Sequence, residues 1–285
     1  MEEKNNITPA IIISHLVLII MLLVILFPAA WVLSTSFSAV NTLNTSSLFP
    51  TEFTVNNYVN LIKETPFLTW MKNSLIICIS STLIALFLTT TAGYAFSRFK
   101  FAGRRFGLMA MIIAQMFPGM MAMVALFKLL NWLGFLTSGA IGLNTLTGLI
   151  LIYAGGSIPF NTWMLKGYID SIPKSIEESA YIDGASKWQT FTKIVLPLLG
   201  PMLVVVAIFS FILPYTDFLL PVILLQDPQK YTLAVGLRSL VSGQFTKNWT
   251  MFTAAATLGA IPIMIMFLSL QRFLVEGLTK GAVKG

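Results

Sequence analysis

The side chains best placed for chemistry lie in one polar stretch, EESAYIDGASKWQTFTKIVLP, which runs from Glu177 to Pro197 between two apolar segments. Its carboxylates, among them Glu178 and Asp183, could cap helix ends or pair with cationic groups of another protein. Gly184 has no Cβ and favours a bend in the chain. Taken alone, each acid is also compatible with ordinary capping on a solvated helix face. The stretch therefore indicates a surface for contact.

Few residues elsewhere in the chain could take part in catalysis or bind a metal ion. The sequence has one histidine, His15, and one cysteine, Cys78, and both lie in apolar runs. We therefore expect no His/Cys metal site, no Cys-His catalytic pair and no intrachain disulfide framework. A GxxxxGK[ST] phosphate-binding loop is absent, and so is an acid-base chain in the centres of the apolar segments. Energy for any uphill transport would have to come from a partner.

Composition predicts an integral membrane protein. Only 10% of the 285 residues are charged, 56% are hydrophobic and the mean hydropathy is +0.82, whereas a soluble domain carries about 25% charged residues. Six apolar segments have about 20 or more residues, enough to cross a hydrocarbon core of about 30 Å. We expect an all-α fold with six transmembrane helices at about residues 11–33, 71–96, 106–130, 145–165, 196–225 and 250–273.

The distribution of Lys and Arg predicts the orientation of these helices. If the N-terminus is inside, 12 of the 18 Lys and Arg residues fall on the cytoplasmic side, with a tight cluster at 98–105. Cytoplasmic loops of membrane proteins carry such an excess. We therefore expect both termini in the cytoplasm, with the polar loop 171–197 and a tail at 274–285 on the same side. The whole chain, 1–285, would form a single transmembrane domain.

Local signals predict two short helices in the loop 171–197. Ser171-Ile172-Pro173 suits a helix start, and Ser175 with Glu178 has the spacing of a capping box. The first helix would end at the Gly184 bend and a second would follow at about 185–194. Beyond the loop, four prolines in segment 196–225 predict a kinked or broken helix. The piece 231–235 is rich in residues that favour strands.

The same stretch carries a resemblance to a known family. Glu178-Ser179-Ala180, Asp183-Gly184-Ala185 and Ile194-Val195-Leu196-Pro197 match the spacing of the EAA motif of ATP-binding-cassette importer permeases, with Ser179 in place of the first alanine. The runs YAFSRF and YTLAVG and the C-terminal ending resemble the MalG type of maltose/maltodextrin permease. The resemblance extends over essentially the whole chain.

This resemblance implies the type I importer permease fold, with cytoplasmic coupling helices that dock in a cleft of an ATPase subunit. Gly184 would allow the bend between these helices, while Ala180 and Ala185 would allow close approach. It assigns ATPase coupling to Glu178, Ser179, Ala180, Asp183, Gly184, Ala185, Ile194, Leu196 and Pro197.

The resemblance also implies partners. These are a homologous permease in a heterodimer, two ATPase subunits that bind ATP and Mg²⁺, and an extracellular substrate-binding protein, all at the bacterial cytoplasmic membrane. The tail at 277–285 would reach toward the ATPase dimer interface, and the outer loop at about 239–248 would enter the sugar cleft of the binding protein. Because the principal sugar contacts of this family lie mostly on the other permease, no sugar ligand is assigned here, and no cofactor or metal is expected in this chain.

The sequence thus predicts a non-enzymatic permease subunit that imports maltose, maltodextrin or a related oligosaccharide. An importer permease for another solute, such as another sugar, a glycerol phosphate or an amino acid, is the main alternative. A secondary transporter, or a membrane scaffold without transport, would be the other classes. Uptake without ATPase genes, or a required intramembrane acid, would support the secondary transporter, whereas sugar-independent complexes would support the scaffold.

Overall fold

A computed structural model describes residues 9–41, 49–242 and 248–282, and this part of the chain is α-helical. Its β-pairing is limited to an isolated bridge between Ser38 and Phe53. The all-α prediction is therefore confirmed. The chain divides into two compact units, one made of Met1–Phe67 with Leu237–Ala260 and the other of Leu68–Gly236 with Ile261–Gly285.

The first unit is held together by polar contacts around Asn57. The Asn57 amide donates hydrogen bonds to the carbonyl oxygens of Ser36 (2.9 Å) and Ser38 (2.8 Å) and accepts one from the Thr250 hydroxyl (3.1 Å). These bonds join the unit's helical segments, which are α1 (Pro9–Ser36), α2 (Asn56–Glu64) and the first part of α13 (Trp249–Ala282).

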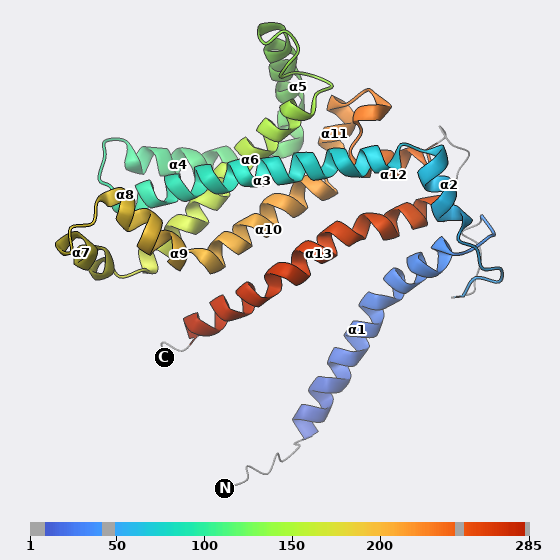
Figure 1. Ribbon diagram of the computed structural model, residues 1–285, viewed down its shortest axis with the longest axis horizontal. Coiled ribbons are helices and arrows are strands. Elements are labelled where there is room, and N and C mark those ends of the chain that lie inside the picture. Colours follow the sequence, from blue (N-terminus) through green and yellow to red (C-terminus); the bar gives the residue numbers. More distant parts are fainter. Residues whose placement is uncertain (1–8, 42–48, 243–247, 283–285) are drawn as a thin grey trace. The chain divides into compact units, whose positions relative to one another are not determined.

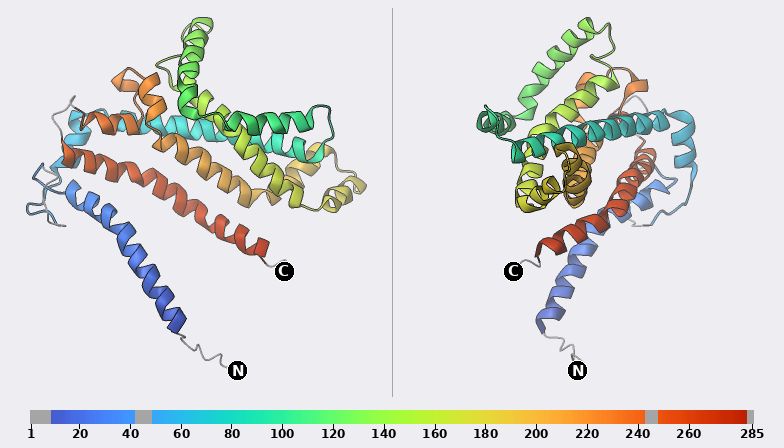
Figure 2. Two further views of the ribbon diagram at one scale, coloured as in Figure 1. Left: turned by 180° about the vertical axis from the view of Figure 1, so that it is seen from behind. Right: turned by 60° about the vertical axis from the view of Figure 1, so that its left-hand side comes forward.

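In the second unit, α6 is the central helix: α4 and α10 pack against it, and Gly93 of α3 lies close to its Leu165. Figure 2 shows α5 extending away from this group of helices. The elements are α3 (Phe67–Arg98), α4 (Arg104–Gln115), α5 (Gly119–Leu136), α6 (Leu146–Ser171), α7 (Lys174–Ile182), α8 (Lys187–Thr190), a π-helix (Phe191–Val195), α9 (Leu196–Leu198), α10 (Gly200–Thr216), α11 (Leu219–Leu224), a 3-10 turn (Pro228–Lys230), most of α12 (Leu233–Ser239) and the end of α13.

Among the described residues, two apolar clusters contribute to the core of the second unit. The first brings together side chains from α3, α5, α6 and α11, namely Ile77, Leu130, Leu149, Leu220, Leu224 and Leu225. The second lies where α3 and α6 end and joins them to the loop 171–197 through Tyr94, Ile169, Ile172, Phe191, Val195 and Leu199. The predicted polar loop is therefore packed against the helices through its own apolar side chains.

Within the described residues, four helices are long and apolar enough to cross a membrane, or five if one bent pair counts as a single span. The four are α1, α3, α5 and α13. The predicted segment 106–130 is interrupted, because α4 ends at Gln115 and α5 begins at Gly119. Pro118, the residue before α5, disfavours the helical conformation in the residue that precedes it.

The predicted break in segment 196–225 is confirmed. The helical stretch Lys187–Leu198 and α10 meet at a bend of 74°. Pro197 and Pro201 lie on the two sides of this bend, and each lacks the N–H that would continue a helix. A second interruption separates α10 from α11, where the Asp217 carboxylate accepts a hydrogen bond from the backbone N–H of Leu219 (2.9 Å).

The strand preference predicted for 231–235 is wrong, because Leu233 begins α12. Side chains near the start of α3 hold this segment in place. The Trp70 indole donates to the Pro228 carbonyl (3.0 Å), and the Ser74 hydroxyl accepts from the Leu233 N–H (2.8 Å). Tertiary contacts with a distant helix thus override the local β preference.

Gly236 is the close-packing position of α12. A Cβ placed there would lie 2.2 Å from ring carbons of the fully buried Trp70. We expect Gly236→Ala to destabilise the protein by about 1–3 kcal/mol, the usual cost of overpacking a core. The measurement is the melting temperature of the purified protein in detergent. Gly167→Ala is the matched control, because a Cβ on Gly167 would meet nothing within 4 Å; an equal effect of both changes would contradict the packing argument.

Candidate functional site

The first helix of the loop, α7, begins without a side-chain cap. Pro173 occupies the N-cap position, and no side chain accepts a hydrogen bond from the first turn. The predicted capping box of Ser175 and Glu178 is therefore wrong. Proline fixes φ near the helical value and has no N–H to satisfy, so it begins the helix by itself, two residues earlier than a Ser175 cap would.

The predicted bend at Gly184 is confirmed. Its φ is +85°, in the left-handed region that glycine adopts without a Cβ penalty. The Gly184 N–H donates to the Tyr181 carbonyl (3.1 Å), and the Ala185 N–H donates to the Ala180 carbonyl (2.9 Å). This pair of bonds is the Schellman arrangement, which satisfies the free carbonyls at a helix end. Backbone geometry therefore requires a residue that tolerates positive φ at position 184.

The second helix has a capping box that the sequence analysis missed. The Ser186 hydroxyl accepts from the Gln189 N–H (3.3 Å), and the Gln189 side chain accepts from the Ser186 N–H (2.8 Å). The S-x-x-Q spacing was the available signal. After α8 the chain continues as the π-helix Phe191–Val195, which contains Ile194. Such π-helical turns are frequent at functional sites.

The outward side of the α7–α8 segment is open to solvent. Ile182 is 87% exposed, and Tyr181 and Trp188 of the same segment are exposed as well; several exposed large apolar side chains together are typical of a contact surface. Of the residues assigned to coupling, one, Ala180, is buried and three, Ala185, Ile194 and Leu196, are half-buried. The exposed ones are Glu178, Ser179, Asp183, Gly184 and Pro197.

The inward side of α7 carries a carboxylate that the sequence analysis did not single out. Glu177 is only 4% exposed. One of its oxygens pairs with Nε of Arg98 at the end of α3, and the other accepts a hydrogen bond from the Tyr94 hydroxyl (3.0 Å). Successive helical residues are about 100° apart around the axis, so Glu177 can face inward while Glu178 faces out.

Arg98 has further partners, which fix its orientation. One terminal nitrogen donates to the Ile172 carbonyl in the turn between α6 and α7 (2.9 Å), and the other donates to the Ser97 hydroxyl (3.1 Å). The side chains of Arg98 and Glu177 are 7% and 5% exposed. A buried ion pair is tolerated only when its remaining donors and acceptors are satisfied in this way.

A second, more exposed ion pair lies next to the first. Lys166 contacts Asp170 within α6 (2.5 Å), and the Ser97 hydroxyl donates to the other Asp170 oxygen (2.5 Å). Partial burial raises the pKa of Asp170, but the hydrogen bonds from Lys166 and Ser97 and the nearby positive charges outweigh it and leave the pKa below its ordinary value. Asp170 is therefore ionised at neutral pH and continues the polar network from α3 to α6.

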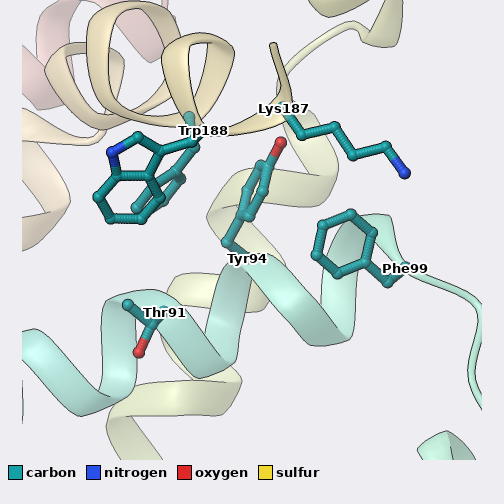
Figure 3. A pocket seen from close by; sticks show the side chains of 6 residues that line it. Thr91, Tyr94, Phe99, Lys187 and Trp188 are labelled. Atoms are coloured by element: carbon teal, nitrogen blue, oxygen red, sulfur yellow. The ribbon is translucent and has the colours of Figure 1, made fainter.

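Aromatic side chains line a cavity of about 340 Å³ beside the buried pair. In Figure 3, Tyr94 points from α3 toward α8 and lies between Trp188 and Phe99. The Tyr94 and Phe191 rings are 4.6 Å apart, and Lys187 lies 5.6 Å from the centre of the Phe99 ring. The polar contacts of Tyr94 and Arg98 are thus surrounded by apolar surface.

Taken together, the segment 171–197 has one side built for attachment to its own helices and one side left for another molecule. Within the described residues, no group of three or more His, Cys, Asp or Glu side chains could hold a metal ion. Two expectations fall partly outside the described residues: positions 243–247 of the outer loop and 283–285 of the tail. The rest of the predicted tail continues α13 as far as Ala282.

Residues 85–280 match the family described as "Binding-protein-dependent transport system inner membrane component". The chain is 39% identical to the maltodextrin transport system permease protein MdxG of Bacillus subtilis, with 96% of each chain covered. It is 40% identical to the galactooligosaccharides transport system permease protein GanQ of the same organism, again with 96% of each covered.

A solved structure supports the fold independently of sequence. The chain is similar to one in the crystal structure of a bacterial ABC transporter involved in the import of alginate, with a TM-score of 0.79. The alignment covers 95% of this chain and 99% of the other, at 21% identity. This likeness confirms the importer permease fold.

Proposed function

Because the chain belongs to the family of binding-protein-dependent transport system inner membrane components, we propose that it is the permease subunit of an ATP-driven importer for maltodextrins or a related oligosaccharide. As a member of that family it is a component of the inner membrane and a permease, not itself an ATPase. The identity of 39% to a maltodextrin permease over nearly the whole chain supports the substrate class.

The proposed topology has six spans with both termini in the cytoplasm. The spans are α1, α3, the interrupted pair α4–α5, α6, the bent segment α9–α11 and α13. α6 has 26 residues, which at about 1.5 Å per residue is about 39 Å and exceeds a hydrocarbon core of about 30 Å. The excess of Lys and Arg at 98–105 supports a cytoplasmic position for the α3–α4 turn, and with it the segment 171–197.

The proposed coupling site is the outward side of α7 and the bend that follows. The observation that carries it is the combination of exposed Ile182 with the exposed carboxylates of Glu178 and Asp183 at the end of a helix that is fixed on its other side. An apolar side chain ringed by polar groups is what a protein contact surface offers. A cytoplasmic ATPase subunit is the partner that this surface would receive.

The proposed assembly contains this chain, a homologous permease, two ATPase subunits and an extracellular binding protein. ATP and Mg²⁺ would be bound by the ATPase subunits. Closure of these subunits would displace the α7–α8 segment and switch the permeases between inward-facing and outward-facing states.

The test is ATP hydrolysis by the co-purified complex in lipid nanodiscs with its binding protein, across a panel of sugars. Stimulation by maltose or maltodextrins is the expected result. Stimulation by galactooligosaccharides instead would favour these sugars as the substrate, in keeping with the 40% identity to GanQ. If no ATPase subunit co-purifies, the coupling proposal is wrong.

A further inference from the structure

The buried pair of Arg98 and Glu177 joins three elements at one point. Glu177 belongs to α7, Arg98 to the last turn of α3, and the Ile172 carbonyl that Arg98 also contacts belongs to the turn after α6. Glu177 lies 79 positions after Arg98 in the sequence, and Ile172 lies 74 positions after it. The contact is therefore a feature of the tertiary structure and not of the local sequence of α7.

The contact also differs in kind from its surroundings. The neighbouring packing of Ala180, Phe191 and Val195 is apolar and non-directional. The ion pair is directional, because Nε and a terminal nitrogen of one planar guanidinium bind a carboxylate in α7 and a carbonyl before α7. Sliding α7 along α3 would separate two desolvated charges, which costs far more than shearing an apolar contact.

The geometry of α3 makes this connection mechanically useful. α3 is a continuous helix of 32 residues, about 48 Å long at about 1.5 Å per residue. Its other end holds the segment 228–233 through Trp70 and Ser74. A displacement applied to α7 and passed to Arg98 would therefore reach the opposite end of the second unit without a flexible joint.

We infer that Arg98 and Glu177 are positioning residues that make α3 move together with the coupling segment when the ATPase subunits displace it. The inference rests on the proposed function, because it needs the ATPase as the source of movement. Glu177 acts through Arg98 and does not contact the ATPase, since it faces away from the exposed side of α7. The exposed Glu178 and Asp183 serve docking, and the buried pair serves transmission.

The test removes the pair without leaving a buried charge. In the charge-free variant, Arg98→Met and Glu177→Met are combined with Tyr94→Phe, because the Tyr94 hydroxyl would otherwise lose its acceptor. Buried ion pairs replaced by apolar residues of similar size commonly leave a folded protein. We expect the ATPase subunits to co-purify and basal ATP hydrolysis to persist, while sugar uptake per ATP hydrolysed falls by about tenfold or more, within the usual range of coupling between sites.

Two measurements separate transmission from stability. The first measurement uses spin labels at Ser175→Cys on α7 and Lys100→Cys beyond α3, in a Cys78→Ala background. In the otherwise unchanged protein, the distance between the two labels should be the same with and without ATP. In the charge-free variant that distance should change on ATP binding. The matched control is Arg105→Met, which removes an exposed cation close in sequence and should leave the uptake-to-hydrolysis ratio unchanged.

Normal uptake per ATP in the charge-free variant would overturn the inference, and so would a label distance that is constant in both proteins. An equal loss of coupling in Arg105→Met would also overturn it, because any lost cation would then suffice. Failure of the proposed function is recognised separately, because the unaltered protein would then lack co-purifying ATPase subunits or sugar-stimulated hydrolysis.

Discussion

Gly184→Pro is expected to reduce sugar-stimulated ATP hydrolysis of the complex to its basal level while the protein remains inserted in the membrane. Gly184 has a φ of +85°, whereas the proline ring fixes φ near −65°. Proline would also remove the N–H that donates to the Tyr181 carbonyl. The chain must then leave α7 in another direction, and the exposed side of the segment 171–197 loses its shape.

The space beside Gly184 is open to a Cβ, so variants with other side chains can serve as controls. A Cβ on Gly184 would meet nothing within 4 Å, so only the backbone conformation is at issue. Gly184→Asn should retain most of the stimulation, because asparagine tolerates positive φ better than other residues with a side chain. Gly184→Val should lose most of it. Normal stimulation in Gly184→Pro would remove the coupling role from this bend.

Arg98→Met is expected to be the most destabilising single change in the second unit, at about 3–5 kcal/mol. Glu177 is 4% exposed in the unchanged protein. The substitution leaves its carboxylate without a cation inside an apolar cluster. The Tyr94 hydroxyl remains as its single hydrogen-bond donor among side chains. The measurement is the melting temperature in detergent, together with the yield of folded protein on size-exclusion chromatography.

The charge-free variant gives this prediction its control. Because it removes the carboxylate along with the cation, it should recover most of the stability that Arg98→Met loses. The effects of the separate changes should therefore be strongly non-additive, as expected for groups in direct contact. If the charge-free variant were as unstable as Arg98→Met, side-chain volume and packing at this point would matter more than the unpaired charge.

The sequence alone determined the parts of this protein that depend on local chemistry. Apolar length located four of the six predicted segments as uninterrupted long helices, because a helix that meets lipid must satisfy its backbone internally and be apolar over its whole length. The bend at Gly184 followed from the need for a residue without Cβ, and the prolines of 196–225 marked the bend that the structure has there. The spacing from Glu178 to Pro197 was sufficient to indicate the family.

Only the tertiary structure decided which of two neighbouring glutamates faces inward. Nothing local distinguishes Glu177 from Glu178, and the choice is made by Arg98, 79 residues away. The strand preference of 231–235 failed for the same reason, because Trp70 and Ser74 hold that segment as the start of a helix. A backbone bend depends on residues next to it in sequence, whereas a buried charge or a close contact depends on a partner that only the folded chain brings near.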